Sequence, residues 1–248
     1  MSLKPGIAIL AALALAGCGA AHMAEQPTGV NDPFEPANRQ VHAFNKGVDT
    51  LLFKARPGQP RNVDNLFVRS VSNAGSNLGL PGKVVNSLLQ GRPEPAVKNT
   101  FRFLINSTIG LAGLFDPAGS SFSLPESDTD FGETLAVWGV GEGPYVEMPF
   151  FGPSTARDAV GRVVDMAINP FEGVWDGTDA TAATTTRLAG KVADRKRFGE
   201  TVESIYYDSA DSYAQARLLY LQMRRYQLSG KEANDALAWD PYADPYAQ

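Results

Sequence analysis

The residue types that most often perform catalysis or bind metal ions are scarce in this chain. It contains one cysteine and two histidines, His22 and His42. Neither histidine has a second His or Cys at the spacing of a metal site, and no G-x-S-x-G sequence is present to position a serine nucleophile. Residues 139–143 contain three glycines but lack the spacing and strand–helix context of a phosphate-binding loop. We therefore expect no enzyme activity, no cofactor and no metal.

The single cysteine is better suited to acylation than to catalysis. It follows Lys4 and an apolar run at 6–17, which at 12 residues is shorter than the roughly 20 that a membrane span requires. The run ends in Leu-Ala-Gly-Cys18, which resembles the lipobox of bacterial lipoproteins, whose cysteine is acylated and becomes the first residue of the mature protein. The alternative is an ordinary cleaved signal followed by an unmodified cysteine. Gly19, where an Asp would favour inner-membrane retention, favours the outer membrane.

The sequence divides into four expected segments. Residues 1–17 form a lipoprotein signal peptide, residues 18–30 an acylated cysteine with a flexible tether, residues 31–228 one helical domain, and residues 229–248 a polar, loosely ordered tail. The formal net charge is −5 and the basic residues do not cluster, which argues against a nucleic-acid partner.

Helical periodicity dominates residues 31–228. The expected helices span residues 37–52, 63–78, 84–90, 95–108, 130–138, 155–168, 179–197 and 199–228. Gly79 and Pro81 are expected to end the second of these helices, and residues 139–154 are expected to hold no regular element. The sequence therefore predicts an all-α fold.

Apolar residues mark one face of several of these helices. In the first helix the face comprises Ala37, Val41, Phe44, Val48, Leu51 and Leu52, a stripe about 100° wide that is typical of an amphipathic helix. In the helix at 155–168 we expect Val160 and Val163 to face the interior and Arg157 and Asp158 to face outward. A tyrosine-rich stripe in the last helix favours core packing.

Four blocks of the sequence carry a family resemblance. They read NDPFEPANRQVHAFN at 31–45, NSLLQG at 86–91, FRFLINSTIGLAGLFD at 101–116 and DFGETLAVWGVGEGPYVEMPFFGPSTARD at 130–158. Together they resemble the MlaA (VacJ) family of outer-membrane lipoproteins, across roughly residues 31–225. The last block is long and specific, whereas the C-terminal tail lies outside the resemblance.

The resemblance implies a single ring-shaped domain of amphipathic helices that lie in the periplasmic leaflet of the outer membrane. It implies an amphipathic channel through which phospholipid misplaced in the outer leaflet is removed, so that lipid asymmetry is maintained. The implied partners are phospholipid, a trimeric outer-membrane porin and a soluble periplasmic lipid carrier of the Mla pathway. A scaffold that only organises porins and, more weakly, a lipase-like enzyme are the alternative functions.

The resemblance and the residue patterns together suggest site residues. Candidates for a channel or gate are Phe44, Asn45, Gly139, Gly141, Gly143, Pro144 and Tyr145. The aromatic residues Phe131, Trp138, Phe150 and Phe151 are either buried or placed at a membrane interface. Arg39, Arg102 and Arg157, the last next to Asp158, are candidates for structural ion pairs; the alternative is contact with a lipid phosphate.

Overall fold

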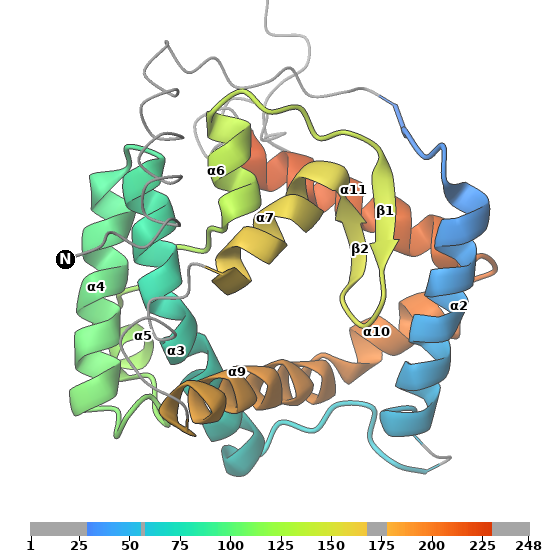
Figure 1. The fold of residues 1–248 in the computed structure, drawn as a ribbon. Coiled ribbons are helices and arrows are strands. Elements are labelled where there is room, and N and C mark those ends of the chain that lie inside the picture. Colours follow the sequence, from blue (N-terminus) through green and yellow to red (C-terminus); the bar gives the residue numbers. More distant parts are fainter. Residues whose placement is uncertain (1–28, 56–57, 168–177, 230–248) are drawn as a thin grey trace, which may run out of the picture.

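The computed structural model describes residues 29–55, 58–167 and 178–229. The expected signal peptide, Cys18 and nearly all of the tether and tail lie outside the described residues. Within these ranges the chain forms nine helices and one two-stranded sheet (Figure 1). The elements are α2 (Glu35–Leu52), α3 (Leu66–Leu89), α4 (Pro93–Thr108), α5 (Pro117–Ser120), α6 (Phe131–Val137), β1 (Tyr145–Met148), β2 (Gly152–Thr155), α7 (Ala156–Ala167), α9 (Thr178–Arg197), α10 (Gly199–Tyr206) and α11 (Ser212–Leu228).

Short polar side chains begin several of these helices. Asn65 accepts a hydrogen bond from the backbone of Val68 at the start of α3. Asp130 caps α6 and Asp211 caps α11 in the same way, and Pro36 lies in the first turn of α2. These caps satisfy backbone N–H groups that have no partner inside the helix. The cap at Asp130 agrees with an expected helix start, whereas the one at Asp211 begins a helix that was not expected there.

The mostly helical fold is confirmed, but the expectation of no regular element at 139–154 is wrong. Strands β1 and β2 pair antiparallel, with Tyr145 opposite Thr155 and Met148 opposite Gly152. Each strand has only four residues, and Pro153 lies in the second. A strand this short gives little alternation, and proline normally argues against a strand, so the sequence pattern conceals the hairpin.

Two helix boundaries also differ from expectation. Helix α3 continues through Gly79 and Pro81 to Leu89, because it packs along both α4 and α9 and buries Leu80, which is 1% exposed. This packing offsets the cost of about 3 kcal/mol for a proline inside a helix. The single helix expected at 199–228 is two helices, because Asp211 caps a new helix after the turn that follows α10.

Contacts between the elements form a closed circuit (Figure 1). Helix α3 packs against α9, α9 contacts α10, and α10 contacts α11. Helix α11 contacts β2, the hairpin contacts α7, α7 packs on α6, and α6 contacts α3. Helix α4 flanks α3, and α2 packs against β1. Elements distant in sequence therefore depend on one another for support.

The apolar core is small. One cluster of buried apolar side chains comprises Tyr145, Tyr213 and Leu221, with Tyr220 packed against it, and other buried apolar residues such as Leu80 lie elsewhere in the described chain. Among the described residues, buried polar and charged residues outnumber buried hydrophobic ones. The tyrosine-rich stripe expected in the last helix runs from Val202 to Met223. It is only partly buried, since Met223 is 55% exposed.

Candidate functional site

Helix α2 buries its polar face and exposes its apolar one. Its buried residues are Asn38, His42, Asn45 and Asp49, which recur at helical spacing. Phe44 and Leu51, on the other side of the helix, are 47% and 84% exposed, and Leu52 in the last turn is 62% exposed. In water this orientation is unfavourable, because each exposed apolar side chain forgoes roughly 1.5–3 kcal/mol of burial.

Helices α4 and α7 show the same inversion. Helix α4 buries Asn99, Arg102 and Asn106, whereas Val97, Phe101 and Leu104 are all more than half exposed. The expected orientation of α7 is therefore wrong: Arg157 and Asp158 are buried, while Val160 and Val163 are 56% and 60% exposed. Periodicity identifies which residues share a face, but it does not say which face meets the protein.

The polar face of α2 holds the β1–β2 hairpin through two amide side chains. Asn38 donates to the carbonyl oxygen of Tyr145 (3.1 Å) and accepts from the backbone N–H of Glu147 (2.9 Å). Asn45 donates to the carbonyl oxygen of Met148 (3.0 Å) and accepts from the backbone N–H of Phe150 (2.8 Å). Each amide thus pairs with the free edge of β1 as a peptide group of a neighbouring strand would.

A buried carboxylate lies between these amides. The side chain of Glu147 accepts a hydrogen bond from the Tyr145 hydroxyl, and its Oε1 lies 3.2 Å from His42 Nδ1. His42 Nε2 lies 3.1 Å from Ser212 Oγ at the start of α11. Burial and the neighbouring carboxylate raise the pKa of Tyr145 above its usual range, so its hydroxyl remains a donor. The network joins α2, β1 and α11.

The glycine segment before the hairpin is exposed but anchored. Gly139 and Gly143 have φ angles of +85° and +69°, which favour glycine. A Cβ atom on Gly141 would meet nothing within 4 Å, so neither close approach nor positive φ requires that glycine. Glu142, which lies between Gly141 and Gly143, is buried, and its carboxylate forms an ion pair with Arg225 at 2.6 Å. The carbonyl oxygen of Pro144 accepts from the backbone N–H of Ala156 at 2.9 Å.

The four candidate aromatic residues fall into two pairs. Phe131 is buried and makes an edge contact with Trp138 (5.7 Å between ring centres), whose indole N–H donates to the carbonyl oxygen of Leu89. Phe150 and Phe151 at the hairpin turn are 74% and 48% exposed. The ring of Phe150 packs edge-on against Phe44 at 5.1 Å, which brings two separate candidates together.

Each candidate arginine lies beside a carboxylate. Arg39 contacts Glu35 and Asp211, both at 2.8 Å, and all three side chains are more than 40% exposed. Arg102 is buried and contacts Asp116 at 2.9 Å. Both arginines therefore form ion pairs, although the buried Nε of Arg102 has no hydrogen-bond partner among the described residues.

The third arginine belongs to a buried charge cluster. Asp158 accepts from Arg157 and Arg224, each at 3.1 Å, and from the Tyr220 hydroxyl at 2.7 Å. Arg224 also contacts Asp130 at 2.6 Å. Burial alone would raise the pKa of Asp158, but the charge and hydrogen bonds of Arg224, with the smaller effect of Arg157, hold that pKa at about 2. The cluster ties α7 to α11 and to the start of α6.

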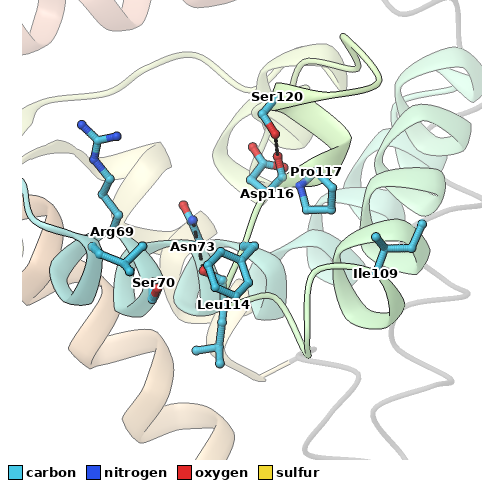
Figure 2. Close-up of a pocket in the computed structure, with 10 residues that line it drawn as sticks. Arg69, Ser70, Asn73, Ile109, Leu114, Asp116, Pro117 and Ser120 are labelled. Atoms are coloured by element: carbon cyan, nitrogen blue, oxygen red, sulfur yellow. Dashed lines mark hydrogen bonds between the residues drawn. The ribbon is translucent and has the colours of Figure 1, made fainter.

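A shallow cavity of about 270 Å³ lies between α3 and the turns at 109–120 (Figure 2). Its lining is mostly apolar, including Leu66, Ile109 and Leu114. Its one cationic side chain, Arg69, is held by both carboxylate oxygens of Asp64, at 2.8 and 2.6 Å. The cavity therefore offers apolar contact but no unpaired charge.

Sequence reasoning did not identify the hairpin attachment. The sequence excludes His42 as a metal ligand, because no second ligand lies at the required spacing, and it gives no indication of a role for Glu147. A signal was nevertheless present, because Asn38, His42, Asn45 and Asp49 recur on one side of α2. Residues of modest helix propensity repeated on one face indicate a polar surface with specific partners.

None of the helices in the described ranges is long and apolar enough to cross a membrane. Outward apolar side chains nevertheless occur on helices throughout the described chain, from Leu51 on α2 to Tyr226 on α11.

Comparison with known proteins places these features in context. A family model described as MlaA lipoprotein matches residues 30–227. A Rickettsia felis protein described as "Uncharacterized protein" is 40% identical over 144 residues, and the match spans only 57% of either chain. The "Intermembrane phospholipid transport system lipoprotein MlaA" of Shigella flexneri is 30% identical over all of this chain and 95% of its own. A solved structure described as "Structural basis for maintenance of bacterial outer membrane lipid asymmetry" is 28% identical, with a TM-score of 0.62 over 79% of this chain and 98% of its own.

Proposed function

This chain belongs to the MlaA lipoprotein family, and from that premise we propose that it removes misplaced phospholipid from the outer leaflet of a bacterial outer membrane. Transport is non-covalent in this proposal. The lipid passes through an amphipathic channel to a soluble periplasmic carrier of the Mla pathway, so that the asymmetry of the membrane is maintained.

The observation that carries the proposal is the inverted orientation of α2, α4 and α7. Exposed apolar side chains are unfavourable in water but not among lipid acyl chains, because acyl chains are themselves apolar. Most buried polar side-chain groups of the described residues are hydrogen-bonded, as a low dielectric around the protein requires. A helical protein in one leaflet combines these two features, whereas an ordinary water-soluble domain does not.

The ring and its channel are supported by the closed circuit of contacts. Exposed apolar side chains lie on several helices of this circuit. We infer that they face acyl chains and that the circuit encloses the path of the headgroup. We assign the segment from Gly139 to Tyr145, together with Phe44 and Asn45, to the wall or gate of that path. Asn45 fixes the hairpin backbone, and Phe44 packs on the hairpin turn.

The proposed anchor and protein partners are supported by the family and by the sequence. Acylation of Cys18 would hold the protein in the periplasmic leaflet of the outer membrane, since several acyl chains give firm attachment. A trimeric porin is the proposed neighbour in the membrane. Exposed apolar residues on several helices provide contact surface for both lipid and such a partner.

The decisive experiment compares outer-leaflet phospholipid in a strain with the gene, without it, and with the gene restored. We expect deletion to raise outer-leaflet phospholipid and the wild-type gene to reverse the increase. Unchanged lipid in the deletion strain, combined with a tight porin complex that contains no lipid, would instead favour the scaffold. Hydrolysed lipid produced by the purified protein would contradict the non-enzymatic mechanism.

The anchor is tested separately with Cys18→Ala. We expect the variant to be lost from the outer-membrane fraction and to fail to restore asymmetry. A variant that fractionates with the outer membrane and complements fully would show that the helices alone attach the protein.

A further inference from the structure

Two lysines share one aromatic ring where α2 ends beside α10. The ammonium group of Lys54 lies 4.6 Å from the centre of the Tyr207 ring, and that of Lys46 lies 5.5 Å from the same centre. Both distances are typical of cation–π contacts. Lys54 is exposed and Lys46 is half-buried, so neither lysine is fully enclosed by the protein.

The Tyr207 ring is held by hydrogen bonds from its hydroxyl group, and the one carboxylate among its partners is already in an ion pair. The Tyr207 hydroxyl donates to Asp49 Oδ2 and lies 2.9 Å from Thr50 Oγ1. Burial and the hydrogen bond to Asp49 raise the pKa of Tyr207 to about 12, so the phenol remains a donor. Asp49 is paired through both oxygens with Arg195, at 2.6 and 2.7 Å. No carboxylate charge of this group is left for the lysines.

The lysines lack the carboxylate partners that most arginines of the described chain possess. Within the described ranges, neither Lys46 nor Lys54 has a carboxylate oxygen within 4.0 Å, although Lys46 lies 3.5 Å from Ser212 Oγ. The nearby acid Asp208 is paired with Arg61 at 2.9 Å. The last carbonyl groups of α2 can offset part of the charge of Lys54 but not that of Lys46, which lies inside the helix.

We propose that Lys46 and Lys54, beside the Tyr207 ring, form a clamp for a phosphate group. Two like charges beside one ring repel each other, and an anion between them would remove that repulsion. Lysine ammonium groups bind phosphate oxygens as point charges without the strict geometry of arginine, which suits transient contact. The ligand class is a phosphate mono- or diester, such as a lipid headgroup or free phosphate.

The neighbouring side chains favour a lipid headgroup. Leu51 and Leu52, 84% and 62% exposed, occupy the last turn of α2 immediately before Lys54. An acyl chain could therefore lie against these leucines while its phosphate meets the ammonium groups. This assignment rests on the proposed function, because it gives the transported phospholipid a first contact on the protein.

The test uses the full chain in a neutral detergent and native mass spectrometry. The probes are dihexanoyl-phosphatidylglycerol and inorganic phosphate, titrated separately and then in competition. We expect Lys46→Gln/Lys54→Gln to weaken binding of the short-chain lipid at least tenfold. The control is Lys98→Gln/Lys196→Gln, which removes the same charge elsewhere and should leave binding unchanged. Lys46→Arg/Lys54→Arg should retain most of the affinity.

The outcomes separate the possible ligands. Binding of the lipid with no competition from phosphate supports a headgroup site, and equal binding of phosphate supports the clamp with free phosphate as its ligand. Equal affinity of wild type and Lys46→Gln/Lys54→Gln for both probes would overturn the clamp. The proposed function fails independently, if the wild-type gene does not restore asymmetry in the deletion strain.

Discussion

At the scale of single residues, amide side chains here substitute for a β-strand. Asn38 and Asn45 each offer one donor and one acceptor to the backbone of the hairpin. A buried amide with a fixed geometry is more specific than an apolar contact, because a shift of the hairpin would leave both groups unpaired.

We expect Asn45→Ala to destabilise the protein by about 2–3 kcal/mol, because the Met148 carbonyl and the Phe150 N–H lose their partners. The loss should be local, with faster hydrogen exchange at residues 148–151 than in wild type. Gln40→Ala on the exposed side of the same helix is the control and should change neither quantity. Unaltered exchange at the turn would mean that Asn45 does not hold it.

Asp158 should give the protein a pH-dependent contribution to stability. Its pKa is about 2 in the folded protein, below the value of about 3.9 in an unfolded chain. A lowered pKa stabilises the fold above the unfolded value, and this stabilisation, on the order of 2 kcal/mol, is lost as pH falls from about 4 towards 2.

Asp158→Asn should destabilise the protein by about 3–5 kcal/mol at neutral pH, because Arg157 and Arg224 lose a buried partner. The difference in the free energy of unfolding between wild type and Asp158→Asn should become smaller as the pH falls from 4 to 2. Chemical denaturation at each pH measures it. Asp211→Asn is the control: its carboxyl pKa is also about 2, but its side chain is 45% exposed and asparagine keeps the helix cap. A constant gap for Asp158→Asn would exclude this linkage.

At the scale of helices and strands, the sequence predicted which residues share a face better than where that face points. The apolar stripe of α2 and the polar stripe of α7 lie as the period of 3.6 requires. Their orientation follows from the surrounding medium, which no window of the sequence records. The hairpin was not predicted because side chains of α2, which is distant in sequence, supply much of its hydrogen bonding.

The crossing of α3 and α9 depends on two glycines. A Cβ atom at Gly75 would lie 2.8 Å from the Cα of Gly190, whereas one at Gly79 on the same helix would meet nothing within 4 Å. Gly75→Ala should therefore destabilise the protein by roughly 1–3 kcal/mol, as overpacking does. Gly79→Ala should stabilise it by up to about 1 kcal/mol through helix propensity. Thermal unfolding of the two variants checks both signs, and equal effects would contradict the close crossing.

In the glycine segment before the hairpin, two substitutions distinguish an effect on stability from an effect on transport. A Cβ atom at Gly141 would meet no atom within 4 Å and the residue is exposed, so we expect Gly141→Leu to have normal abundance and an unchanged melting temperature. Gly143→Leu should destabilise by about 1–2 kcal/mol, because its φ is +69° and its Cβ would lie 3.1 Å from Ala156 Cβ. If the segment lines the lipid path, Gly141→Leu will fail to restore asymmetry despite its stability. Full restoration would place the segment outside the path.

At the scale of the whole molecule, the outward apolar faces of the helices can be tested directly. They either contact lipid or belong to the protein core. Val163→Lys adds a charge to the exposed face of α7, where Val163 is 60% exposed. In a leaflet this charge is costly, by up to about 3 kcal/mol at the depth of the acyl chains. In water it should change the free energy of unfolding by less than about 0.5 kcal/mol.

We therefore expect Val163→Lys, in protein prepared without acyl chains, to lower the vesicle-bound fraction several-fold in flotation, with unchanged helical circular dichroism. Thr201→Lys, an exposed polar position on α10, is the matched control and should float like wild type. Loss of helical structure in Val163→Lys would indicate that the α7 face is a core after all.

The polar interior also determines how stability responds to temperature. Unfolding raises the heat capacity when it exposes apolar surface and lowers it when it exposes polar surface. Here much of the apolar surface is already outside, and many buried groups are amides and ion pairs. The heat-capacity increment per residue should therefore fall below the usual value of about 12–15 cal/mol/K. Such a chain has a shallow stability curve, with neither a sharp optimum nor a steep decline on cooling.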